Sequence, residues 1–188
     1  MRKLILGFTL MLMGIVGFGQ VSDQAVIPVS VTLNSILRLT IISGGNIQFV
    51  VNTIDQYEMG IANSSRYTTT FSVASSREFD VLINAESSSF IGTDDVANVM
   101  DLNNVGFVCP DNANGGTFNA DAGDQEGLDQ AQFTLIAGCP AGGSAINTFE
   151  LQWELGTTAG SMNADNLLTQ SLPPDNYVTN VFLVVDPL

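Results

Sequence analysis

Histidine is missing from this 188-residue sequence, and lysine occurs only at position 3. Without these side chains, the chain lacks the groups needed for Ser-His-Asp or Cys-His catalysis, for Schiff-base chemistry and for imidazole-bound zinc. The glycine motifs that bind phosphates or dinucleotides are also missing. Carboxylate chemistry remains, but one Trp and three Tyr provide few aromatic platforms for a sugar substrate. We therefore expect a protein that is not an enzyme.

Basic residues are almost absent beyond position 3. Residues 20–188 contain only Arg38, Arg66 and Arg77 against nineteen Asp and Glu, a net charge of −16. Such a surface repels nucleic acids and anionic lipids, which are bound by clustered Lys and Arg. The charge excludes nucleic acid as an expected partner and favours solubility.

The first nineteen residues have the pattern of a secretory signal peptide. Arg2 and Lys3 precede an apolar run over residues 4–16, and small residues, Gly17 and Gly19, stand before Gln20. We expect residues 1–19 to be removed and residues 20–188 to form a single domain, secreted to the extracellular space or the cell surface. No later apolar run is long enough to span a bilayer, so we expect no membrane insertion of the mature chain.

Only two cysteines occur, Cys109 and Cys139. In an exported chain an even pair predicts one disulfide. It would close a loop of about 30 residues and stabilise the fold by roughly 3–4 kcal/mol in the chain-entropy model. The alternative is two unpaired, buried thiols.

Apolar and polar residues alternate in short runs along most of the chain, and turn-forming residues separate the runs. In the clearest run, Phe149, Leu151, Trp153 and Leu155 share one face, which predicts that Trp153 lies in the core. About eight to ten short strands are expected, which indicates an all-β, antiparallel β-sandwich of broadly immunoglobulin-like architecture. The other predicted strands lie at residues 36–42, 47–51, 57–62, 67–73, 79–85, 105–109, 133–137 and 177–185. One short helix is possible over residues 93–103.

The same alternation begins immediately after the signal peptide. Ala25, Ile27, Val29, Val31 and Leu33 point to one side of the predicted strand over residues 25–33. This strand either is the first strand of its own domain or is donated to a neighbouring subunit. Pro28 lacks a backbone N–H, so the strand should lie at an edge or leave that position unpaired.

Residues 110–130 form a long acidic loop without alternation. Asn119, Asp121, Asp124 and Glu126 supply hard oxygen ligands of the kind that Ca²⁺ prefers, although their spacing differs from that of an EF-hand. The alternative is a solvated acidic loop without metal, and no other cofactor is expected.

Two stretches resemble known secreted proteins. TFSVASSREFDVLINAES (residues 70–87) resembles paired central strands of secreted immunoglobulin-like modules. LPPDNYVTNVFLVV (residues 172–185) resembles the C-terminal strand of bacterial pilus subunits, including spore-coat-U-like pilins, with Asn176 in place of the usual Gly. The resemblance implies a pilin-like structural subunit of a fimbrium or surface layer, in which an N-terminal strand fills a groove in the next subunit.

These observations lead to one functional expectation and one alternative. We expect a non-enzymatic structural subunit of an extracellular filament, pilus or cell-surface layer, which self-assembles into a homopolymer by β-strand complementation. The alternative is a monomeric secreted binding module or adhesin that recognises a glycan or Ca²⁺ through the 110–130 loop.

Overall fold

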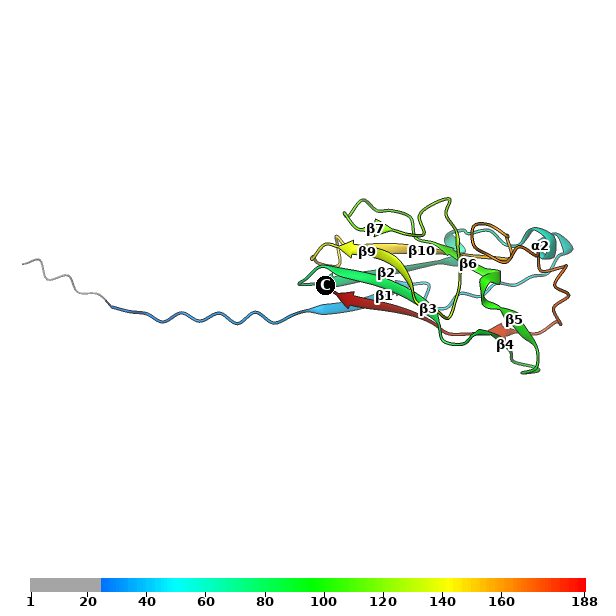
Figure 1. The fold of residues 1–188 in the computed structure, drawn as a ribbon, viewed down its shortest axis with the longest axis horizontal. Helices are drawn as coiled ribbons and strands as arrows, with labels where there is room; N and C mark the ends of the chain where they lie inside the picture. Colours follow the sequence, from blue (N-terminus) through cyan, green and yellow to red (C-terminus); the bar gives the residue numbers. More distant parts are fainter. Residues whose placement is uncertain (1–24) are drawn as a thin grey trace, which may run out of the picture. The chain divides into compact units, whose positions relative to one another are not determined.

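The computed structural model describes residues 25–188, and its chain divides into two units, Met1–Leu33 and Asn34–Leu188. In the first unit, residues 25–33 have no regular secondary structure. The second unit is a compact domain that contains every described strand (Figure 1). The signal peptide predicted over residues 1–19 lies outside the described residues.

The domain consists mainly of short β-strands. In chain order its elements are β1 (Leu37–Ser43), α2 (Ile54–Met59), η1 (Ser65–Tyr67), β2 (Thr68–Ser75), β3 (Phe79–Ala85), β4 (Ser89–Gly92), β5 (Val99–Asp101), η2 (Leu102–Asn104), β6 (Val105–Val108), β7 (Thr117–Phe118), β8 (Glu126–Gly127), β9 (Phe133–Cys139), β10 (Thr148–Leu155), β11 (Tyr177–Val178) and β12 (Val181–Pro187).

The strands form three antiparallel sheets. The five-stranded sheet has the order β1-β2-β10-β6-β8, the four-stranded sheet has the order β12-β3-β9-β7, and a small third sheet has the order β11-β4-β5. β1 is therefore an edge strand of the first sheet, and β12 is an edge strand of the second. Each of the two pairs with one neighbour within Asn34–Leu188, β1 with β2 and β12 with β3.

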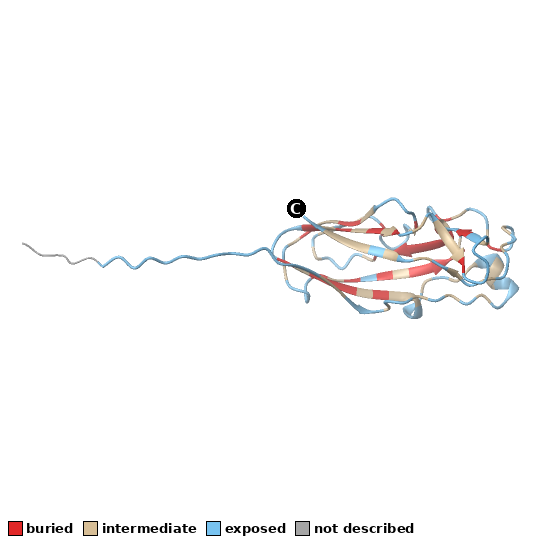
Figure 2. Cartoon of the chain, turned by 90° about the horizontal axis from the view of Figure 1, so that it is seen from below, coloured by how far each residue is buried: buried red, intermediate tan, exposed pale blue. Residues whose placement is uncertain are grey.

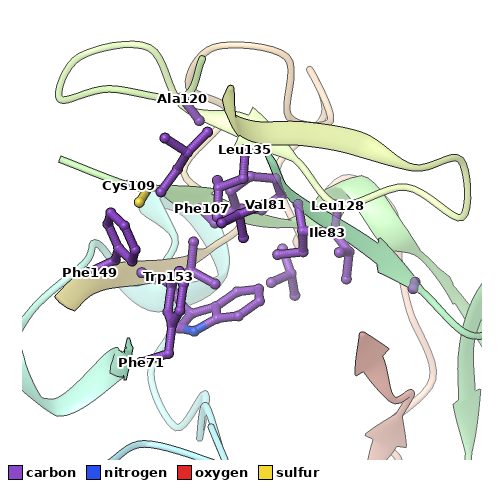
Figure 3. Packing of buried hydrophobic residues seen from close by; sticks show 14 of the residues in the cluster. Phe71, Val81, Ile83, Phe107, Cys109, Ala120, Leu128, Leu135, Phe149 and Trp153 are labelled. Carbon is purple, nitrogen blue, oxygen red and sulfur yellow. The ribbon is translucent and has the colours of Figure 1, made fainter. Parts of the chain in front are cut away.

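The core lies between the two larger sheets. Along β3 every second residue is buried, which follows from the two-residue period of a strand with one face toward the core. Phe107 of β6 lies 6.0 Å from Trp153 of β10 in an edge-to-face arrangement, measured between ring centroids. Side chains from both sheets meet in this cluster (Figure 3), and buried residues follow the strands of the domain (Figure 2).

The predicted all-β antiparallel sandwich is confirmed, and Trp153 is buried, with 7% of its surface exposed. The strand predicted over residues 57–62 is wrong, because α2 occupies the first half of this range and the second half contains only an isolated bridge between Ile61 and Leu155. Thr53 caps the helix by accepting a hydrogen bond from the backbone N–H of Gln56, whose side chain accepts one from the backbone N–H of Thr53. Reciprocal capping of this kind favours a helix over an isolated strand.

The helix considered for residues 93–103 is also absent. β5 and η2 occupy the second half of this range. Residues 93–98 form a turn that is stabilised by a residue distant in the sequence. The Asp175 carboxylate accepts hydrogen bonds from the backbone N–H groups of Asp94 and Asp95. Among residues 25–188, no helix is long and apolar enough to cross a membrane.

Candidate functional site

The first candidate feature is the segment of residues 25–33. Its side chains are exposed, and for Ile27, Val29, Val31 and Leu33 the exposed fraction ranges from 78% to 91%. Isolated apolar residues are common on protein surfaces, but a regular row on an unpaired segment marks a surface that other chains can cover. This is the segment in which the sequence predicts a first or donated strand.

The second feature is a groove within Asn34–Leu188, with a mainly apolar lining at one end and a more polar lining at the other. Two cavities of about 430 and 450 Å³ adjoin each other. They share six lining residues, so they form one continuous groove: Asn46, Ile47, Phe49, Phe90, Val105 and Thr179.

The groove runs between two stretches of chain, and along one edge of each stretch the backbone has no neighbouring strand. One wall is formed by β1 and the following residues 46–51, and the other by β11, Thr179 and β12. Unpaired strand edges present a row of N–H and C=O groups that can pair with a further strand. Leu151 and Trp153 of β10 lie at the bottom, so a strand entering the groove would reach the main core.

A chain of two hydrogen bonds fixes the first wall to the groove floor. The indole N–H of Trp153 donates to Oγ1 of Thr69 at 3.0 Å, and the Thr69 hydroxyl donates to the carbonyl oxygen of Gly44 at 2.6 Å. Gly44 has a φ of 67°, and a Cβ atom there would lie 2.0 Å from the carbonyl oxygen of Thr68. Only glycine fits this turn, where the chain leaves β1.

The far wall is held by Asp175 and Tyr177. The Tyr177 hydroxyl donates to the carbonyl oxygen of Pro173 at 2.7 Å. The Asp175 carboxylate accepts from the backbone N–H of Asp94 at 2.9 Å and from the side-chain amide of Asn98 at 2.9 Å. The hydrogen bonds to Asp175, above all the one from the Asp94 N–H, lower the pKa of this carboxyl group to about 2.

Cys109 and Cys139 are buried free thiols in the structure, so the disulfide stays a prediction. Cys109 follows β6 of the five-stranded sheet, and Cys139 ends β9 of the four-stranded sheet. Burial above all, together with the neighbouring Cys139 thiol, raises the pKa of Cys109 to about 12. Burial also raises the pKa of Cys139 to about 11, against a hydrogen bond with the side chain of Asn114 that lowers it.

The 110–130 loop does not assemble its four candidate calcium ligands. The Asp121 carboxylate accepts hydrogen bonds from the backbone N–H groups of Asp111 and Ala122, which lower its pKa. The Asn119 side chain donates to the carbonyl oxygen of Thr134, and Glu126 lies in β8. Asp124 is exposed.

Across residues 25–188, no three His, Cys, Asp or Glu side chains are placed to hold a metal ion. The loop is instead anchored to the domain through buried Ala120, whose carbonyl oxygen accepts from the backbone N–H of Cys109. The four candidate calcium ligands of this loop are therefore not arranged around a common metal position.

Sequence reasoning identified the 25–33 segment but missed the groove. The groove arises because β1 and β12, which are far apart in the chain, are both sheet edges.

Comparison with known proteins does not identify a family for this chain. No protein-family model and no curated protein matches it.

Proposed function

We propose that this protein is a non-enzymatic structural subunit of an extracellular filament or surface layer. Residues 25–33 of one subunit enter the groove of another, and repetition of this step produces a homopolymer. The observation that supports the proposal is that one chain carries both complementary parts. It has a row of exposed apolar side chains on an unpaired segment and a groove between two open strand edges, which is mainly apolar beside β1 and β12.

The energetics favour such an assembly. Burial of the five apolar side chains Ala25, Ile27, Val29, Val31 and Leu33 would contribute on the order of 5–10 kcal/mol, an upper bound before the segment's ordering entropy is subtracted. Backbone hydrogen bonds to the open edges add to this and fix the direction of the strand. An association of this kind resists mild denaturant.

The acidic composition fits the same role. With nineteen Asp and Glu and few basic residues, the subunits repel one another except where apolar contacts and backbone pairing overcome the repulsion. Such a balance keeps subunits from clumping through their outer surfaces. It also predicts that moderate salt accelerates assembly by screening the repulsion.

The test uses the full mature chain and a pair of matched variants. Val29→Asp places a charge on the apolar face of the segment, whereas Ser30→Asp places the same charge on the opposite face. Both sites are exposed and unpaired, so neither change disturbs the domain. We expect the wild-type chain and Ser30→Asp to form filaments in negative-stain electron micrographs, and Val29→Asp to remain monomeric in sedimentation velocity runs.

A wild-type chain that stays monomeric at all accessible concentrations would contradict the proposal. That result would favour the alternative of a monomeric binding module. Equal assembly by Val29→Asp and Ser30→Asp would also contradict it, because the apolar face of the segment would then have no part in the contact.

A further inference from the structure

The chain between β1 and α2 has the side-chain pattern of a strand but no strand partner. Ile47, Phe49 and Val51 are half-buried and pack against the core, while Asn46, Gln48 and Val50 are exposed. The ring of Phe49 stacks on that of Tyr67, with 4.4 Å between the centroids. The side chains thus fix residues 46–51 in place by packing alone.

The backbone of this segment is free. Within the described part of the chain, no N–H or C=O group of residues 46–51 takes part in a hydrogen bond. The pairing of β1 with β2 ends at Ser43 opposite Thr70, and the side chain of Gln56 accepts from the N–H of Asn52 just beyond the segment. Six consecutive residues therefore keep their main-chain donors and acceptors available.

The turn at Gly44 directs the chain away from β2. A residue with a side chain would clash there with the backbone of Thr68 and Thr69, and the Thr69 hydroxyl holds the Gly44 carbonyl. Beyond this turn the segment lines both cavities of the groove, opposite Thr179 and Tyr177. A strand lying in the groove would have residues 46–51 on one side and the edges of β11 and β12 on the other.

We propose that residues 46–51 are the main-chain partner of the donated strand, and that this segment becomes a true β-strand only when residues 25–33 of a second copy pair with it. This inference rests on the proposed function and assigns the recognition edge. Side chains of the donor fill the groove, and the backbone of residues 46–51 sets its register.

Amide exchange measured residue by residue tests this pairing. The sample is the full mature chain with Val29→Asp, which is kept monomeric by its own defective segment, and the probe is a synthetic peptide of residues 20–33 with the natural sequence. The N–H groups of a strand point alternately to its two edges, so a partner on one edge protects every second amide. We expect peptide binding to slow exchange at least about tenfold at either residues 46, 48 and 50 or residues 47, 49 and 51.

The control is the same peptide carrying Val29→Asp, which should neither bind nor change the exchange rates. Peptide binding that leaves all six amides exchanging as before, or that protects all six alike, would overturn the assigned edge while the proposed function stands. Absence of peptide binding together with a monomeric wild-type chain would overturn both.

Discussion

The indole N–H of Trp153 donates a hydrogen bond to Oγ1 of Thr69 at 3.0 Å, and both residues are buried. The pair joins neighbouring strands β10 and β2, and the Thr69 hydroxyl extends the connection to the Gly44 carbonyl. A polar contact under the groove thus fixes the turn from which residues 46–51 begin. The first prediction tests this connection.

Thr69→Val keeps the shape of the side chain but removes the hydroxyl. The buried N–H of Trp153 and the Gly44 carbonyl then lose their partner, and we expect the free energy of unfolding to fall by about 1–3 kcal/mol. Thr69→Ser keeps the hydroxyl and should lose less than about 1 kcal/mol, because only one methyl group is removed. Urea denaturation of the two variants measures the difference, and equal losses would show that the hydroxyl has no such role.

Trp153 should report a buried environment, because only 7% of its surface is exposed. It is the only tryptophan, so its fluorescence is free of other indole contributions. We expect a blue-shifted emission maximum and weak quenching by acrylamide, and Trp153→Ala should lower the free energy of unfolding by roughly 3–5 kcal/mol. Emission typical of indole in water would contradict the packing.

Asp175 should make stability depend on pH in the acidic range. Its pKa is lowered from 3.8 to about 2, so the ionised carboxylate stabilises the folded state above pH 3.8, and this contribution is lost as the pH falls toward 2. Asp175→Asn should therefore lower the melting temperature at pH 7, and the difference from wild type should shrink near pH 2.

The matched control is Asp165→Asn, since Asp165 is exposed and its carboxylate accepts no hydrogen bond from the described residues. We expect no comparable change in its melting temperature at pH 7. A constant difference between Asp175→Asn and wild type from pH 7 to pH 2 would contradict the account.

Cys109 and Cys139 should form a disulfide when the protein is exported. Mass spectrometry of the unreduced mature protein should show a mass two hydrogens lower than that of the reduced chain, and two free thiols would contradict the prediction. The bond should raise the free energy of unfolding by roughly 3–4 kcal/mol. In reduced protein, the raised pKa values of about 12 and 11 leave little thiolate, so alkylation at pH 8 should be slow until the chain unfolds.

The alternation in the sequence predicted the β-sandwich and the inward position of Trp153, because strands with one buried face carry that pattern directly. The same pattern at residues 47–51 indicates that Phe49 is half-buried, but it carries no information on backbone pairing. The strand predicted there is therefore absent for a reason that the sequence does not reveal. Thr53 and Gln56 do carry a readable helix-capping signal, and it accounts for the wrong strand at residues 57–62.

The groove could not be predicted for a different reason. It depends on β1 and β12 being edges of their sheets, and strand order follows from contacts between distant parts of the chain. The segment of residues 25–33 is ambiguous from sequence for a related reason. An apolar row at Val29 and Val31 has the same period whether its partner lies in the same chain or in another.

Photo-crosslinking from position 29 tests the proposed assembly most directly. A photoreactive side chain replaces Val29 in the full mature chain, and equal amounts of ¹⁵N-labelled and unlabelled protein are mixed before irradiation. Mass spectrometry then identifies both the attached residue and the chain from which it comes. Donation between subunits predicts cross-links joining labelled to unlabelled chains, at groove residues such as Phe49, Thr179 and Leu183. Cross-links confined to a single chain, or attached outside the groove, would contradict it.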